Sequence, residues 1–246
     1  MFNYQIIIEY DGTNFVGWQK QKNGHSIQQT IEKILTKILK EKIILYGSGR
    51  TDAGVHAEGQ SANFSLKSKI NNKYSFLNSV NFFLNKKKIS ILKIIEKKLD
   101  FHARFSAKKR EYKYLIINRI APSSLEFNRA WHIKTNLNLK LMKKATNLLK
   151  GKKDFSTFRS SSCNAKSPIK TLDEAKVKKL GDKIIIIFKS KSFLQQQVRS
   201  MVGCLKYVGE DKWNLKKFRT IIKSKKRANC APPAPAHGLY LSKVSY

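Results

Sequence analysis

The sequence predicts an α+β protein made of two consecutive ferredoxin-like halves, each with the element order β-α-β-β-α-β. Two observations predict this class. Strand-like and helix-like hydrophobic patterns follow one another in the same order twice along the 246 residues. No Gly- or Ser-rich linker separates the two series, so we expect packed antiparallel sheets with a basic active-site cleft between the halves. The boundary is expected at residues 105–108, which divides the chain into domains 1–107 and 108–246.

The first half opens with a β-rich run at 4–10 that ends at the turn residues Asp11-Gly12. Ser26 and Gln29 form a capping box, and the helical spacing of the apolar residues that follow predicts a helix to residue 39. The remaining patterns of this half predict, in order, a strand at 43–46, a glycine-punctuated loop at 47–59, a strand at 60–65, a helix at 74–84 and an extended segment at 89–95.

The second half repeats this order of elements. Gly181-Asp182 predicts a hairpin turn between two strands, and Asn138 is expected to cap a helix. A proline-rich stretch at 232–235 precedes the last strand. The predicted elements are strands at 111–118, 171–180, 183–189 and 238–244, and helices at 139–149, 194–205 and 215–223.

Composition excludes several classes of protein. Hydrophobic residues make up 41% of the chain and aromatic residues 11%, which is enough for a core and excludes wholesale disorder. The longest candidate apolar run, at 184–188, is far shorter than the roughly 18 residues that span a membrane, and the N-terminus lacks a secretory signal pattern. Cys163, Cys204 and Cys230 form no CxxC pair and cannot all be paired within one chain, which favours a reduced cytosol and a cytoplasmic protein.

The chain is strongly basic. Lys and Arg number 50 and Asp and Glu 16, so the formal net charge is +34. Of the basic residues 41 are Lys, and Ile and Asn are also abundant; A- and T-rich codons encode all three and account for part of the lysine content. The positive field still attracts polyanions, so nucleic acid is the expected partner, with a merely drifted basic surface as the alternative. A membrane surface is less favoured, because no basic amphipathic helix stands apart from the fold.

The most informative loop is at 47–56, where three glycines allow sharp turns and close approach to a ligand. Its glycine spacing fits neither a phosphate-binding nor a dinucleotide-binding fingerprint. Arg50 beside Asp52 favours an ionised carboxylate, which suits a nucleophile; the alternative is a structural turn that Asp52 caps. Only Glu58 is a nearby second acid, so a paired-carboxylate mechanism is poorly supported. His56 is either a general base or, more favoured, a hydrogen-bonded structural residue.

No other constellation competes with this loop. The five histidines are scattered without metal-ligand spacing, and no GxSxG nucleophile elbow occurs, so neither a metal nor another cofactor is expected. A second signal comes from the basic and aromatic run at 108–114, where Arg110, Tyr112 and Tyr114 share one face of a strand. Tyrosines on such a face either stack on a nucleobase or pack against a helix.

A set of motifs in a fixed order extends almost from end to end of the chain. The run Gly49-Arg50-Thr51-Asp52-Ala53-Gly54-Val55-His56-Ala57 resembles the catalytic motif of the tRNA pseudouridine synthase A family. Further segments resemble the opening, middle and second half of that family: 9–12, 15–19, 26–28, 100–107, 110–114, 155–159, 198–203 and 235–241.

The resemblance implies a role for four residues. Asp52 takes the place of the catalytic aspartate, and Tyr112 that of the tyrosine that stacks on the target uracil. Arg199 matches the basic residue that pairs with the aspartate, and Arg50 the arginine that helps to evert the base. Domain 1–107 would then carry the catalytic loop, and domain 108–246 the other two residues. One departure is the glutamine run 195–197, where many members have Met or another apolar residue just before the Val-Arg pair.

The resemblance also implies the reaction. Members convert uridine to pseudouridine at positions 38, 39 and 40 of the tRNA anticodon stem-loop, without a cofactor and as homodimers. Asp52 would attack C1′, abstract the 2′ proton or add to C6 of the base, and the sequence does not choose among these. A non-catalytic RNA-binding protein on the same fold is the main alternative, against which the joint presence of Asp52, Tyr112 and Arg199 argues. An RNA-cleaving or metal-dependent enzyme is disfavoured because clustered acidic or histidine ligands are missing from the sequence.

Overall fold

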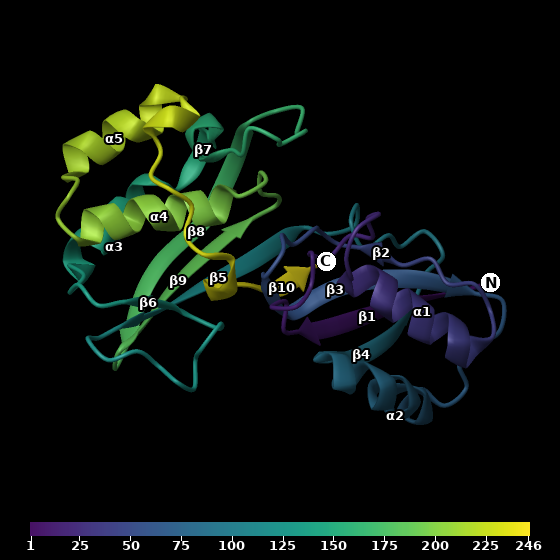
Figure 1. Cartoon of the computed structure of the whole chain (residues 1–246). Coiled ribbons are helices and arrows are strands. Elements are labelled where there is room, and N and C mark those ends of the chain that lie inside the picture. Colours follow the sequence, from purple (N-terminus) through teal and green to yellow (C-terminus); the bar gives the residue numbers. More distant parts are fainter. The chain divides into compact units, whose positions relative to one another are not determined.

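A computed structural model describes all residues 1–246, and it has an α+β fold with five α-helices and ten strands (Figure 1). The chain forms two compact units. The first contains Met1–Lys108 and Tyr240–Tyr246, and the second contains Lys109–Leu239. The end of the chain thus belongs with the first unit, whereas the sequence patterns had placed it in the second half. The physical reason is strand pairing, because Tyr240 and Leu241 pair in parallel with His56 and Ala57. No helix is long and apolar enough to cross a membrane.

The first unit is a sheet with two helices. The strand order is β4-β1-β3-β10, and β2 also pairs with β3. Strand β1 lies antiparallel to both β3 and β4, so its residues Tyr4, Ile6 and Ile8 are fully buried. The elements are β1 (Phe2–Tyr10), α1 (Ile27–Leu39), β2 (Tyr46–Gly47), β3 (His56–Leu66), α2 (Lys73–Leu84), β4 (Ile89–Lys97) and β10 (Leu239–Ser245).

Helix α1 forms where its sequence predicts it. The Ser26 hydroxyl accepts a hydrogen bond from Gln29 N–H (3.2 Å), which satisfies one of the free amides of the first turn. Ile27, Ile31 and Leu35 recur at i, i+4 and i+8 and are buried, so one stripe of the helix contributes to the core.

The second unit has the strand order β5-β9-β8-β7, with β6 parallel to β5. Its hairpin turn lies at Gly181-Asp182 as predicted, since Leu180 pairs with Lys183. Asn138 caps α3 as predicted, because its Oδ1 accepts from Leu141 N–H (3.1 Å). The elements are β5 (Lys109–Asn118), β6 (Trp131–Ile133), α3 (Leu139–Leu148), β7 (Gly151–Asp154), β8 (Ile169–Leu180), β9 (Lys183–Ser190), α4 (Gln197–Gly209) and α5 (Leu215–Ser224).

The structure corrects the prediction of a strand at 43–46. Only Tyr46 and Gly47 form a strand, β2. The backbone before them is paired with side chains of α1 instead of a neighbouring strand: Ile43 N–H donates to Thr36 Oγ1 (3.1 Å) and Leu45 N–H to Glu32 Oε1 (2.9 Å). The apolar side chains of Ile43 and Leu45 are nevertheless buried, which explains why the segment has a strand-like pattern.

Two boundaries and two short strands also differ from the prediction. Strand β2 ends at Gly47 and strand β3 begins at His56, so the expected loop at 47–59 spans only 48–55. Helix α4 begins at Gln197 and not at 194, because Gln196 before it has a left-handed backbone (φ 59°). The short strands β6 and β7 were not predicted, since three or four residues give too little alternation to detect.

Candidate active site

The loop that carries Arg50 and Asp52 joins β2 to β3 in the first unit, and hydrogen bonds hold the start of its backbone. Ser48 N–H donates to the Ser61 carbonyl (2.7 Å), and the Gln60 amide donates to the Gly49 carbonyl (2.9 Å). These contacts join the start of the loop to the strand that follows it. The loop is therefore a rigid platform and not a freely moving turn.

The segment at 11–18 holds the middle of the loop from a second side. Trp18 N–H donates to the Thr51 carbonyl (3.0 Å), and Gly54 N–H donates to the Phe15 carbonyl (3.4 Å). Inside the segment, Gly17 has φ +108°, and a Cβ at this position would lie 2.6 Å from the Thr51 oxygen. Only glycine allows this approach, so Gly17 is part of the reason why the loop has its shape.

Side chains around the loop are also paired. The Thr51 hydroxyl lies 2.8 Å from the Tyr10 hydroxyl, and both groups are buried. Asp52 lies between the buried residues Thr51 and Val55 and is itself half-buried. Arg50, just before Thr51, is exposed. The loop thus holds one carboxylate at a partly solvated position and leaves one guanidinium reaching into solvent.

His56 is a structural residue of this site. The residue is 2% exposed, its ring stacks on Tyr240 at 4.8 Å, and Nδ1 accepts from Gly12 N–H (3.0 Å). In the neutral ring the proton is therefore on Nε2. Nδ1 also lies 3.3 Å from Asp11 Oδ1. This geometry supports the structural interpretation of His56 over that of a general base.

Asp11 is ionised beside this histidine. Burial raises the pKa of its carboxyl, and hydrogen bonds from the Thr13 hydroxyl (2.6 Å) and the Thr13 N–H (3.0 Å) lower it. Nearby positive charge, including that of Lys88, lowers it as well, and together these effects outweigh burial, so the Asp11 pKa lies below its usual value.

In the second unit, Tyr112 lies on β5 opposite Phe188 and is 8% exposed. Its ring meets Phe193 edge to face, with centroids 5.1 Å apart and planes at 86°. Tyr114, two residues along the same strand face, is fully buried and donates from its hydroxyl to the Pro235 carbonyl (2.8 Å). Tyr114 is therefore a core residue, so the packing alternative holds for this tyrosine. Phe193 holds the orientation of the Tyr112 ring.

Arg199 is the third residue of α4 and is tied to the proline-rich segment. Its Nε donates to the Ala234 carbonyl (2.7 Å), and Ala234 N–H donates back to the Arg199 carbonyl (3.0 Å). Gly203, one turn later, allows the segment to pack closely, because a Cβ there would lie 2.1 Å from the Pro232 oxygen. Burial raises the pKa of the Tyr114 hydroxyl well above its usual value, and the positive charge of Arg199 opposes this rise. The Arg199 guanidinium therefore lies close enough to Tyr114 to interact with its hydroxyl electrostatically.

The glutamine run before Arg199 has an unusual member. Gln197 is 1% exposed, and its Oε1 accepts from Leu194 N–H (2.8 Å), which fixes the orientation of the amide. Its Nε2 is buried without a hydrogen-bond partner. A buried donor without a partner costs about 1–3 kcal/mol, so the Gln197 amide lowers the free energy of unfolding of this chain.

The predicted site residues thus fall into two groups. Arg50 and Asp52 lie on one loop of the first unit, and Tyr112 and Arg199 lie on β5 and α4 of the second. That the two groups act on one substrate stays a prediction. The structure also brings together residues that the sequence did not connect: Cys204 and Cys230, 26 positions apart, have Sγ atoms 3.4 Å apart.

Comparison with known proteins points to the same family as the sequence motifs. The sequence profile of a family described as tRNA pseudouridine synthase matches residues 6–106 and 145–246. The chain belongs to the tRNA pseudouridine synthase family. Arg50, Asp52 and Arg199 lie within the two matched ranges, and Tyr112 lies between them.

Curated members of the tRNA pseudouridine synthase family match over the whole chain. The tRNA pseudouridine synthase A of Pelagibacter ubique is 61% identical over 246 residues and is covered completely, as is this chain. Those of Parvibaculum lavamentivorans and Ehrlichia ruminantium are each 43% identical, with 100% and 99% of both chains covered. A solved structure described as a Cbf5-Nop10-Gar1 complex aligns with 82% of this chain and 45% of its own at 12% identity, with a TM-score of 0.36, which is too low to carry an argument.

Proposed function

We propose that this chain converts uridine to pseudouridine at positions 38, 39 and 40 of the tRNA anticodon stem-loop, with Asp52 as the nucleophile. Isomerisation of uridine in tRNA is the activity of the family to which it belongs. The resemblance to the family adds the three tRNA positions and the residue roles to this proposal. It also adds a homodimeric, cytoplasmic enzyme with two ferredoxin-like halves. One observation carries the proposal: the loop with the family's catalytic motif is held rigidly and leaves the Asp52 carboxyl partly solvated.

In this proposal the protein's own side chains carry out the isomerisation. The C1′–N1 bond breaks, the uracil turns, and C5 joins to C1′; the C5 hydrogen leaves to water as a proton and N1 takes up a proton. Apart from this proton exchange nothing is transferred between molecules and no net oxidation occurs, so the protein needs only a nucleophile or base, a place for the detached uracil and contacts that hold the RNA. Asp52 supplies the first of these through C1′, the 2′ proton or C6, and the three routes stay open.

Tyr112 and Arg50 act on the target base. A stacked uridine must leave the helix before it reacts, and unstacking costs a few kcal/mol. In the proposal, Arg50 takes the position that the base vacates and the Tyr112 ring stacks on the everted uracil, which offsets this cost. The edge-to-face contact of Tyr112 with Phe193 supports this role, because a ring that is already oriented loses little entropy on stacking. In the proposal, Arg199 takes the role of the family's basic residue that pairs with the catalytic aspartate, and its positive charge would keep that carboxylate ionised.

The test uses three anticodon stem-loops, each with a single 5-tritiated uridine, at position 38, 39 or 40. Because the C5 hydrogen is lost on isomerisation, tritium release into water measures turnover. We expect release from all three substrates and none with the Asp52→Asn variant. Release from one position only would correct the specificity, and tRNA binding without release would favour the non-catalytic RNA-binding protein.

A further inference from the structure

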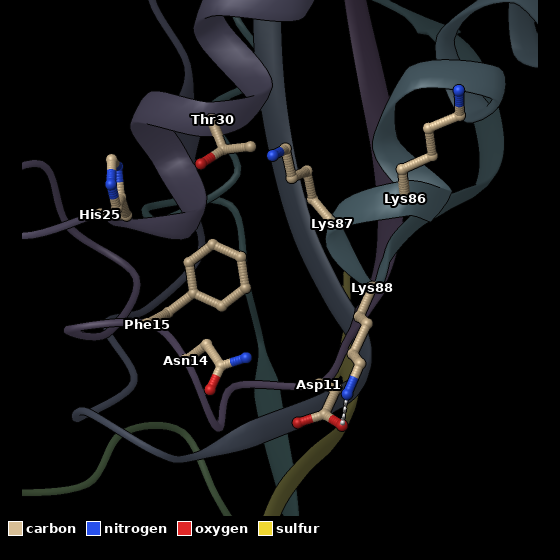
Figure 2. Close-up of a pocket in the computed structure, with 8 residues that line it drawn as sticks. All are labelled: Asp11, Asn14, Phe15, His25, Thr30, Lys86, Lys87 and Lys88. Carbon is tan, nitrogen blue, oxygen red and sulfur yellow. Dashed lines mark ion pairs between the residues drawn. The ribbon is translucent and has the colours of Figure 1, made fainter.

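A pocket of about 270 Å³ lies in the first unit, beside the segment that holds the catalytic loop (Figure 2). Its size is just below the roughly 300–1,000 Å³ of sites for drug-sized ligands, so it suits one small group. The Phe15 ring lies in its middle, with Asn14 below it and Thr30 above it in this view. The lining residues are Asp11, Asn14, Phe15, His25, Thr30, Lys86, Lys87 and Lys88.

The three lysines of the pocket have different roles. The Lys88 ammonium turns to Asp11, 3.8 Å from Oδ2, and neutralises the one carboxylate of the lining. Lys86 points away from Phe15, and its Nζ lies 4.9 Å from the centroid of the Phe82 ring. Only the Lys87 ammonium extends across the pocket toward Thr30, and no protein group pairs with it. The pocket therefore offers one uncommitted cation.

Other lining groups are also uncommitted. The half-buried Phe15 ring makes no contact with another ring, and the Asn14 amide and His25 imidazole are exposed and make no side-chain hydrogen bond. An aromatic face, one ammonium and two short hydrogen-bonding side chains match the parts of a nucleotide. Bases stack on aromatic rings, phosphates take lysine, and base edges take amide and imidazole groups.

The pocket is joined to the catalytic loop through one backbone hydrogen bond and one side-chain contact. The Phe15 carbonyl accepts from Gly54 N–H (3.4 Å), two residues after Asp52. Asp11, at the rim, contacts His56 at the other end of the same motif. A group held on Phe15 therefore lies next to the backbone that positions Asp52, in the same unit.

We propose that this pocket binds a nucleotide of the substrate RNA other than the target uridine, with its base on Phe15 and its phosphate on Lys87. The inference rests on the proposed function for its substrate. Attachment to the RNA chain is favoured over a free nucleotide, because the pocket offers only one uncommitted cation for a phosphate and the chain's net charge of +34 attracts a polyanion.

The test measures the affinity of full-length tRNA for the complete chain at several salt concentrations, with two neighbouring lysines compared. Lys87→Gln should weaken binding three- to tenfold and reduce the salt slope by about one. Lys86→Gln makes the same change of charge one residue away and should weaken binding less than twofold. Phe15→Leu should weaken binding at least fivefold, and Phe15→Tyr, which keeps a stacking face, should bind within twofold of the parent.

The outcomes separate this inference from the proposed function. Equal effects of Lys87→Gln and Lys86→Gln, or equal effects of Phe15→Leu and Phe15→Tyr in folded variants, would overturn the pocket proposal even while pseudouridine forms. A parent that makes no pseudouridine but shows the expected binding pattern would overturn the function and leave the pocket standing. Saturable binding of UMP that Lys87→Gln abolishes, with unchanged tRNA affinity, would make the pocket a free-nucleotide site and would also overturn the proposal.

Discussion

The two groups of candidate site residues are held in different ways. Asp52 lies on an irregular loop whose shape depends on backbone hydrogen bonds and on the close approach of Gly17. Tyr112 and Arg199 lie on a regular strand and helix, and their side chains are positioned by Phe193 and by the Ala234 carbonyl. The loop depends on several backbone contacts with the segment at 11–18, so the main chain sets its shape. On the strand and helix, Tyr112 depends on a ring contact with Phe193, and Arg199 depends on a hydrogen bond to the Ala234 carbonyl, which is 35 positions away.

The largest effect is expected from the loop itself. Asp52→Asn keeps the size of the side chain and removes its charge, so pseudouridine formation should fall below detection. Affinity for tRNA should stay within several-fold of the parent, because binding depends mainly on phosphate contacts. Turnover and affinity are measured on the same preparation. Turnover above the level that trace deamidation to Asp explains would remove Asp52 from the mechanism.

Next in size is the effect of a glycine outside the motif. Gly17→Ala places a methyl group 2.6 Å from the Thr51 oxygen at a positive φ, so it should destabilise the fold by about 2 kcal/mol or more and reduce turnover in the folded fraction. Gly181→Ala is the matched control, because it also has a positive φ but nothing lies within 4 Å of its Cβ. It should cost only about 1 kcal/mol and leave turnover unchanged. Equal losses of turnover in the two variants would mean that loop shape does not depend on Gly17.

In the second group, Tyr112→Ala should reduce turnover strongly through loss of a stacking surface worth about 1–3 kcal/mol. Tyr112→Phe keeps the ring and should retain more activity. Both variants should bind tRNA with the parent's salt dependence, since no phosphate contact is removed. If the Phe variant folds and is as inactive as the Ala variant, the hydroxyl takes part in hydrogen bonding or proton transfer and the stacking role is wrong.

The smallest effect is expected from the residue that supports Tyr112. Phe193→Leu removes an edge-to-face contact worth about 0.5–1.5 kcal/mol while keeping an apolar side chain. Turnover should fall a few-fold, and less than in Tyr112→Ala. The double variant with Tyr112→Ala should be no worse than Tyr112→Ala alone, because Phe193 acts through that ring. Additive losses would show that Phe193 contributes independently of Tyr112.

Local signals in the sequence predicted much of the fold. The cap at Ser26 and the turn at Gly181-Asp182 lie where they were expected, because each depends on residues a few positions apart. The expected strand at 43–46 was wrong because its backbone partners, Thr36 and Glu32, are side chains of a helix, which alternation cannot reveal. The place of the last strand in the first unit depends on pairing with residues about 180 positions away, and no local pattern records that.

The sequence predicted the candidate site less completely than the fold. Residue chemistry alone left Asp52 as a nucleophile or a turn cap, and only the resemblance to a family chose a role, which stays a prediction. The interactions of Asp11 with His56 and of Phe193 with Tyr112 join residues 45 and 81 positions apart. In the sequence, Asp11 was recognisable as a turn residue and as part of the family's opening motif, and no pattern predicted a role for Phe193. The pocket around Phe15 and Lys87 likewise combines segments that are distant in sequence.

The most direct test of the division between the two groups is a single-turnover experiment with enzyme in excess over one tritiated stem-loop. RNA binding and tritium release are recorded together for the parent, Asp52→Asn and Tyr112→Ala. The account predicts that all three bind, that Tyr112→Ala releases tritium slowly, and that Asp52→Asn releases none. Release by Asp52→Asn as fast as by Tyr112→Ala, with deamidation excluded by mass spectrometry, would contradict the assignment of the reacting carboxylate to the loop.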